Sequence, residues 1–324
     1  MPIKHLVIAG GGPIGLQFLG ALEHLNEQGF WNFEEIESIY ATSIGTFLGA
    51  IICLKYDWST LNKYIIERPW HDAFKLNGKQ ILDAFYNKGL YDKKVIEIVF
   101  KPLLQAKDLS LNITLKEFYE YSKIEFHLYT FELNKFETTD ISYKTHPDLL
   151  LTQAIHMSSA LPGVFIPTIS DSGCYIDGGV MSNYPLSYCL QNCKNEDEIL
   201  GITFYRDYTK SDAYKNNIVT EDSSVIDFSI GFFINAMNYI YKTIKRDTIY
   251  NQVECLNDDN FLTMETIQKS INNIDMRRDW IDKGKKDAQN FLEKIKNKNK
   301  NKDKEEEKGS EPALANTDYL QNCV

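Results

Sequence analysis

Apolar and polar positions follow two different periods over the first fifty residues. Residues 6–9 form a short apolar run ending in three glycines, which predicts a buried strand and a tight loop. Apolar positions with helical spacing follow, up to a stop at Gly29. Residues 36–41 then predict a second strand and residues 44–54 a second helix. This order is typical of a βαβ unit, so the pattern predicts an α/β fold with a parallel sheet.

The remainder of the chain continues this mixture of elements. Residues 58–122 are predicted to be largely helical, with interruptions at glycine and proline positions. Further strands are predicted at residues 125–131, 136–142, 174–176 and 199–205, and further helices at residues 148–158 and 281–293. The strand at 199–205 is expected to be the last one in the chain.

Residues 225–244 form the most apolar segment in the second half of the chain, and they include Phe228, Phe232 and Phe233. A helix with this composition is most often buried, so one interpretation is a helix that caps the sheet. The other interpretation is a helix that contacts lipid or lines a substrate channel. The pattern leaves both open.

The C-terminal segment has a different composition. Residues 294–302 alternate mainly between lysine and asparagine, and a block of three glutamates follows at 305–307. Because this segment has no apolar face, we expect residues 294–324 to be a disordered tail. Residues 1–293 are expected to form a single α/β domain.

Composition excludes several classes of partner. The 324 residues are 43% hydrophobic and 25% charged, with a net charge of −10, so a nucleic-acid partner is not expected. Membrane contact would have to be mainly apolar for the same reason. The six cysteines are scattered, which predicts neither a disulfide framework nor a metal site. With no signal peptide and no apolar run of about 18 residues, the expected location is cytoplasmic, with peripheral membrane contact left open.

The glycine-rich loop Gly10-Gly11-Gly12-Pro-Ile-Gly15 lies between the first strand and the first helix. Such a loop exposes N–H groups at a helix N-terminus, where they can hold a phosphate or an oxyanion. Its spacing also fits a dinucleotide-binding motif, which requires an acidic residue at the end of the second strand. That strand ends at Ala41 without one, so the nucleotide interpretation is disfavoured.

A second motif, Ala41-Thr-Ser43-Ile-Gly45, stands between the second strand and the second helix. A serine at a sharp strand-to-helix turn projects its hydroxyl away from the sheet, next to a helix N-terminus that stabilises negative charge. Small residues two positions away on either side permit the turn. An ordinary serine N-cap is the alternative interpretation of this motif alone.

A third motif is Asp177-Gly178-Gly179, a carboxylate on a glycine-rich turn at a strand end. It can act as a general base, although Asp-Gly is also a common turn. All six histidines precede Asp177, whereas an α/β-hydrolase triad runs serine, acid, histidine along the chain. A Ser43–Asp177 dyad is therefore the hydrolytic arrangement that remains.

These three motifs, in this order, resemble the patatin-like phospholipase family over residues 4–293. The segment from Pro147 to Pro162 and the helix beginning at Asp282 are also similar to family elements. The resemblance implies a three-layer α/β/α fold with a mainly parallel central sheet. It also implies a lipid acyl hydrolase with Ser43 as nucleophile and Asp177 as base, without a metal or cofactor. The amides of Gly10, Gly11 and Gly12 would form the oxyanion hole, supported by Gly15, Ala41, Gly45, Gly178 and Gly179.

Two positions depart from the family pattern. Ala41 replaces the first glycine of the serine turn, and Ile14 stands where many members carry arginine or lysine. A relative with weak catalysis that binds lipid or a partner through the same cleft is therefore an alternative, and it requires a turn distorted by Ala41. The sequence does not specify the head group, the chain length or the regiospecificity of a lipid substrate.

Overall fold

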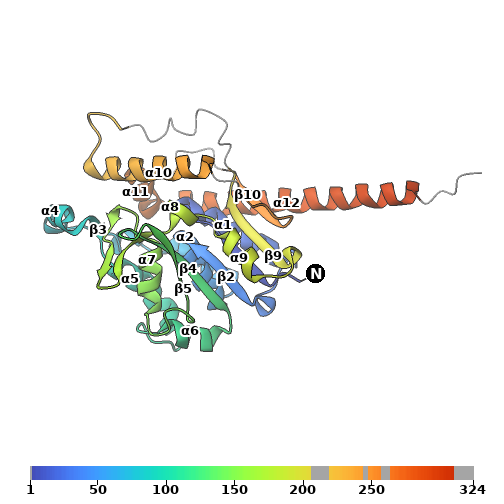
Figure 1. Ribbon diagram of the computed structural model, residues 1–324, viewed down its shortest axis with the longest axis horizontal. Helices are drawn as coiled ribbons and strands as arrows, with labels where there is room; N and C mark the ends of the chain where they lie inside the picture. The colour runs from blue at the N-terminus through green and yellow to red at the C-terminus, as the bar shows by residue number, and fades with distance from the viewer. Residues whose placement is uncertain (1, 206–218, 244–246, 257–262, 310–324) are drawn as a thin grey trace, which may run out of the picture.

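The computed structural model describes residues 2–205, 219–243, 247–256 and 263–309, the last eleven of these by backbone alone. A mixed sheet lies at its centre (Figure 1), with the strand order β10-β9-β1-β2-β4-β8-β7 and with β5 paired to β4. Its strands are β1 His5–Ile8, β2 Ser38–Thr42, β4 Glu125–Glu132, β5 Glu137–Ile141, β7 Thr168–Ser170, β8 Gly173–Asp177, β9 Ile199–Phe204 and β10 Gln252–Cys255.

Five neighbouring strands, from β10 to β4, run parallel. The central strand β1 is buried on both faces. Leu6 and Ile8 belong to the main core, and Val7 belongs to a smaller core on the other face. A parallel sheet covered on both faces is the predicted α/β/α arrangement, and the structure confirms it.

The helices form two unequal layers around this sheet. Most of them contribute to the main core, whereas α9 contributes Leu186 and Cys189 to the smaller one. The α-helices described are α1 Leu16–Glu27, α2 Ile44–Cys53, α3 Trp58–Glu67, α4 Gly78–Asn87, α5 Lys94–Gln105, α6 Leu115–Ser122, α7 Leu151–Ser158, α8 Gly179–Ser182, α9 Leu186–Asn192, α10 Val225–Thr243, α11 Met264–Asn272 and α12 Ile274–Gly309. Short 3-10 turns include η1 Gly12–Gly15 and η3 Trp70–Asp72.

Strand β4 pairs with β5 along one edge, through its residues 128–132. Along its other edge it pairs with two strands, β2 and then β8. Strand β2 pairs in parallel and ends with Thr42 opposite Tyr129. Strand β8 pairs antiparallel and ends with Asp177 opposite Thr130. The ends of β2 and β8 therefore meet at adjacent positions of β4, although 134 residues separate Ser43 from Asp177 in the sequence.

Helix α10 covers the core near this junction (Figure 1). Its inner face contributes Ile230, Phe233, Ile234 and Met237 to an apolar cluster, whereas Phe232 is exposed. The interpretation as a capping helix therefore holds for the inner face; Ile244, the predicted last residue, lies outside the described residues. In the described ranges, no helix combines the length and the apolar character needed to cross a membrane.

Four short strands, the helices α8, α9 and α11, and one helical extension were not predicted. Strands β3 Gly89–Tyr91 and β6 Gly163–Phe165 pair in parallel as a separate two-stranded sheet, β7 pairs with β8, and β10 follows the strand expected to be last. Strands of three or four residues are too short to show a period. Helix α12 continues through residues 294–309, where a disordered tail was expected; lysine and glutamate are good helix formers, and residues 294–308 contain no glycine or proline. Residues 310–324 of the expected tail lie outside the described residues.

Two glycines allow α1 and α12 to pack backbone against backbone. A Cβ atom on Gly20 would lie 1.9 Å from the carbonyl oxygen of Ile281, and one on Gly284 would lie 1.8 Å from that of Gln17. Carbonyl groups within helices cannot move aside without displacing the helix. The contact attaches the last helix to the first helix of the βαβ unit.

We predict that Gly20→Ala lowers the free energy of unfolding by about 2–3 kcal/mol, because its methyl group would force the two helices apart. Urea denaturation followed by circular dichroism measures the change. Gly78→Ala is the matched control, since nothing lies within 4 Å of its Cβ position. Equal stability of the two variants would contradict the backbone contact.

Candidate active site

Ser43 stands at the turn between β2 and α2 in a backbone conformation that non-glycine residues rarely adopt, with φ 54° and ψ −124°. Hydrogen bonds on both sides hold this turn. The Ser43 amide donates to Ser158 Oγ at 3.0 Å, and the Thr42 hydroxyl donates to the Ser182 carbonyl at 2.6 Å. Ser158 in turn donates to the carbonyl of Tyr129 on β4 at 2.6 Å. The conformation of the serine is therefore fixed from the sheet itself.

The alanine that departs from the family pattern fits this turn. Ala41 is fully buried and lies in regular register between Ile8 and Leu128. Its methyl group forms part of the main core. The glycine on the other side of the serine is needed for a different reason, because a Cβ on Gly45 would lie 2.4 Å from the Ile8 carbonyl oxygen. The close approach of helix and strand thus requires glycine at position 45 only.

Asp177, the last residue of β8, lies beside the serine and is 5% exposed. Burial raises the pKa of its carboxyl group to about 6. The hydrogen bond from the Gly179 amide at 2.8 Å and the nearby Ser43 hydroxyl act in the opposite direction and lower this pKa. The two residues identified from sequence motifs therefore lie together and line the same two cavities.

The glycine-rich loop lines the same small cavity as Ser43 and Asp177, but its backbone amides differ in their hydrogen bonding. The Gly10 amide donates to the Asn183 carbonyl at 2.8 Å, and the Asn183 side-chain amide donates to the Gly10 carbonyl at 3.1 Å. Gly10 is therefore occupied as a structural anchor, which differs from its expected place in an oxyanion hole. The amides of Gly11 and Gly12 donate to no described residue. Both glycines line a small cavity of about 40 Å³ together with Ser43 and Asp177.

The supporting glycines act through close packing. A Cβ on Gly15 would lie 2.5 Å from the Ile44 side chain, next to the serine. A Cβ on Gly178 would lie 2.3 Å from the Tyr129 carbonyl oxygen. Ile14, at the position where many family members carry a cation, is buried in the main core. No cation is therefore supplied by this position.

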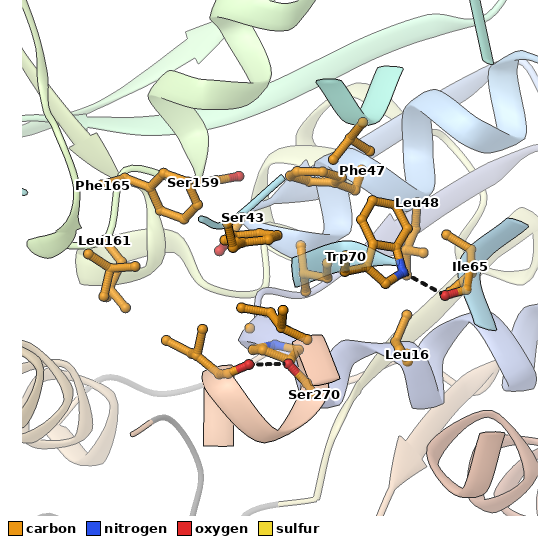
Figure 2. Close-up of a pocket in the computed structure, with 18 of the residues that line it drawn as sticks. Leu16, Ser43, Phe47, Leu48, Ile65, Trp70, Ser159, Leu161, Phe165 and Ser270 are labelled. Carbon is orange, nitrogen blue, oxygen red and sulfur yellow. Dashed lines mark hydrogen bonds between the residues drawn. The ribbon is translucent and has the colours of Figure 1, made fainter. Parts of the chain in front are cut away.

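A larger apolar cavity of about 200 Å³ extends from the serine into the main core (Figure 2). In Figure 2, Ser43 lies between Leu161 on one side and Trp70 on the other. The Trp70 indole donates to the Ile65 carbonyl at 2.8 Å. Most of the side chains around it are aliphatic or aromatic, including Leu16, Phe47, Leu48, Ile51, Leu161 and Phe165. Arg277 also borders the cavity, but its guanidinium donates only to backbone carbonyls. This cavity suits a hydrocarbon chain.

Helix α10 closes the site above the glycine loop. Phe233, Ile234 and Met237 line the small cavity opposite the glycines. The Tyr241 hydroxyl donates to the Gly179 carbonyl at 3.1 Å and accepts a hydrogen bond from the Asn183 amide. Tyr241 was not identified from the sequence, because no local motif connects a residue on a distant helix to the aspartate turn.

All six histidines are described, and none of them lines either cavity. His156 lies two residues before Ser158, which holds the serine turn. Its Nε2 donates to the Ile166 carbonyl at 2.8 Å, and burial lowers its pKa. His127 pairs with Asp140 at 2.9 Å. The only titratable side chain that the structure brings to Ser43 within these cavities, apart from the distal Arg277, is Asp177.

Comparisons with known proteins agree with this geometry. The family model described as Patatin-like phospholipase matches residues 6–190, more than half of the chain. The "Probable lipid hydrolase 463L" of Invertebrate iridescent virus 6 is 28% identical over 228 residues, which cover 66% of this chain and 73% of that protein. The "Lysophospholipase NTE1" of Kluyveromyces lactis is 24% identical over 204 residues, which cover 58% of this chain and 12% of that protein.

A solved structure shows the same fold. VipD from Legionella pneumophila superposes with a TM-score of 0.53 at 15% sequence identity, over 90% of this chain and 67% of that chain. A likeness at this identity concerns the fold alone. The family model covers the serine turn, the aspartate turn and the glycine loop together, and the chain therefore belongs to the patatin-like phospholipase family.

Proposed function

We propose that this protein is a lipid acyl hydrolase that cleaves fatty-acyl esters of glycerolipids through an acyl-enzyme. The observation that carries the proposal is that Ser43 and the buried Asp177 carboxylate lie together on the wall of an apolar cavity. Membership of a family that includes lipid hydrolases supports the reaction class. The head group and the position of the cleaved ester are left open.

In the first half-reaction, Ser43 Oγ attacks the ester carbonyl carbon while its proton passes to Asp177. The negative charge that develops on the carbonyl oxygen would be stabilised by the amides of Gly11 and Gly12. Collapse of the tetrahedral intermediate breaks the bond to the alcohol oxygen, which takes the proton from Asp177. In the second half-reaction, water attacks the acyl carbon while it gives a proton to Asp177. The second tetrahedral intermediate then collapses, the bond to Ser43 Oγ breaks, and Ser43 Oγ takes the proton from Asp177 as the fatty acid is released.

An aspartate is a weak base, and burial compensates for part of this weakness. A pKa of about 6 brings the proton affinity of Asp177 closer to neutral pH than that of an exposed aspartate. The apolar walls that would accept the acyl chain also exclude water from the carboxylate. The same cavity therefore supports both substrate binding and the activation of the base.

The alternative of a catalytically weak relative requires a distorted serine turn. The unusual backbone angles of Ser43 and the regular register of Ala41 support an intact turn instead. We therefore retain hydrolysis as the proposed function, and lipid binding without turnover becomes an outcome of the experiments below.

We expect Ser43→Ala to abolish labelling by a fluorophosphonate probe, and Asp177→Asn to reduce ester hydrolysis at least about a thousandfold, because a dyad loses its function when either member is removed. Ser159→Ala is the matched control. Ser159 also lines the apolar cavity, and its buried hydroxyl has no hydrogen-bond partner among the described residues. If Ser43→Ala is still labelled, or if Ser159→Ala alone loses labelling, Ser43 is not the nucleophile.

The pKa of Asp177 predicts the acid limb of the pH profile. A general base must be ionised, so kcat/KM for a soluble ester should rise with pH, reach half its maximum near pH 6 and level off above it. Product chromatography between about pH 4.5 and about pH 8 measures the profile on either side of this value. A rate that is constant through pH 6 would be inconsistent with Asp177 as the base.

Asp177 should also reduce stability at neutral pH. Because its folded-state pKa is raised, its contribution to stability is complete below the unfolded value near 4 and is lost as the pH rises through about 6. Asp177→Asn removes the free-energy cost of burying an ionised carboxylate. It should therefore stabilise the protein by roughly 1–3 kcal/mol at neutral pH, with little effect near pH ~4. Urea titrations at both pH values test this, with the exposed Asp171→Asn as control. A destabilised Asp177→Asn at neutral pH would contradict the desolvation argument.

A further inference from the structure

Helix α4 has its apolar face turned away from the protein. Ile81 and Leu82 are 58% and 76% exposed, and Phe85 and Tyr86 are 78% and 84% exposed. The half-buried side of the same helix consists of Gln80, Asp83 and Ala84. None of its ten residues is buried, and the helix lies at the margin of the molecule (Figure 1). The hydrophobic effect favours the opposite rotation of such a helix, unless another apolar phase covers the outer face.

Local hydrogen bonds maintain this helix without a core of its own. Asn77 and Gln80 form a capping box, with the two backbone-to-side-chain bonds at 2.9 and 3.1 Å. Lys88 ends the helix in the left-handed conformation, with φ 67°. The helix is therefore formed before any partner arrives, and its exposed face is a fixed surface.

The charge around α4 is opposite to that of the whole protein. Residues 75–94 contain five lysines and two aspartates, whereas the chain carries a net charge of −10. The side chains of Lys75, Lys79 and Lys88 are exposed and form no ion pair with any described residue. An apolar face beside exposed lysines that form no described ion pair matches the chemistry of an anionic lipid surface.

Both ends of α4 are attached to the apolar cavity. Phe74 precedes the helix and lines the cavity, and Tyr91 follows it on β3. Their rings pack edge to face at 5.3 Å, and Tyr91 packs on Phe165, another lining residue, at 5.9 Å. An apolar phase that covers the outer face of α4 would therefore lie near the wall of the cavity.

The first half of α10 also exposes apolar side chains. Val225, Phe228 and Phe232 are exposed at helical spacing. On the inner side, Ile226 and Ala84 pack against one apolar cluster, which connects α10 with α4.

We propose that α4 is a membrane-docking helix, which places its outer face in the headgroup region of an anionic phospholipid membrane and positions the acyl cavity beside it. A second copy of this chain is a poorer occupant, because a symmetric contact through α4 would place lysines opposite lysines. The consequence for substrate supply rests on the proposed function, but docking itself is measured without catalysis.

The experiment uses the full-length chain carrying Ser43→Ala, so that no lipid is consumed. Flotation is measured with vesicles of phosphatidylcholine alone and with vesicles that contain about one third phosphatidylserine. We expect binding to the anionic vesicles, and Leu82→Ser with Phe85→Ser should weaken that binding at least about tenfold. Leu256→Ser, which removes an exposed leucine beside β10 at the other edge of the sheet, is the matched control and should bind unchanged.

A second variant separates charge from apolar contact. Lys75→Gln with Lys79→Gln and Lys88→Gln should reduce binding to the anionic vesicles about tenfold or more and leave binding to phosphatidylcholine nearly unchanged. Light scattering without vesicles tests for a second copy of the chain. A dimer that becomes a monomer when Leu82 and Phe85 are replaced would overturn the proposal and assign the face to self-association.

Equal flotation of the Leu82→Ser, Phe85→Ser variant and its parent would also overturn docking through α4. The same double substitution with Ser43 intact should hydrolyse a short soluble ester at the wild-type rate and act more slowly on vesicles. Loss of vesicle binding with normal hydrolysis of the soluble ester supports docking. Absence of soluble-ester hydrolysis in the wild type would contradict the proposed function and leave the flotation result intact.

Discussion

One edge of β4 carries β2 and β8 in line, and this pairing sets where the Ser43 and Asp177 side chains meet. Thr42 lies opposite Tyr129 and Asp177 lies opposite Thr130, so the strand ends occupy consecutive positions. The buried Thr130 hydroxyl reinforces the junction by donating to the carbonyls of Ile176 at 2.7 Å and Met157 at 2.9 Å. A shift of one residue in either pairing would turn one of the two candidate side chains to the other face of the sheet.

The environment of this junction is consistent with the role of general base proposed for Asp177. Removing water from the carboxylate raises its pKa, and the few hydrogen bonds it accepts leave it partly uncompensated. The cost in stability is tolerated because the surrounding contacts over-determine the geometry. Ser158 holds the serine turn, and Tyr241 and Asn183 hold the aspartate turn against the glycine loop. Strain and desolvation are thus concentrated at one point, as is usual for functional sites.

The molecule has two apolar surfaces of different kinds, the inner cavity and the exposed face of α4. The inner cavity is lined mostly by apolar side chains, together with Ser43 and Asp177. The outer face of α4 is covered by nothing in the described chain, and Phe74 and Tyr91 on either side of this helix pack against each other and connect it to the cavity wall. The proposed docking helix and the proposed acyl site are therefore neighbours in the fold.

The sequence by itself determined the elements whose signals are local. The parallel βαβ start, the serine turn, the aspartate turn and the order of the histidines all follow from neighbouring residues, since turn chemistry and periodicity act over a few positions. Tertiary structure alone decided which amides of the glycine loop are available, because Gly10 is engaged by Asn183 from a distant segment. It also decided the outward rotation of α4, the strands β3, β6, β7 and β10, and the position of Tyr241. These features depend on contacts between residues far apart in the chain, and no pattern along the sequence records them.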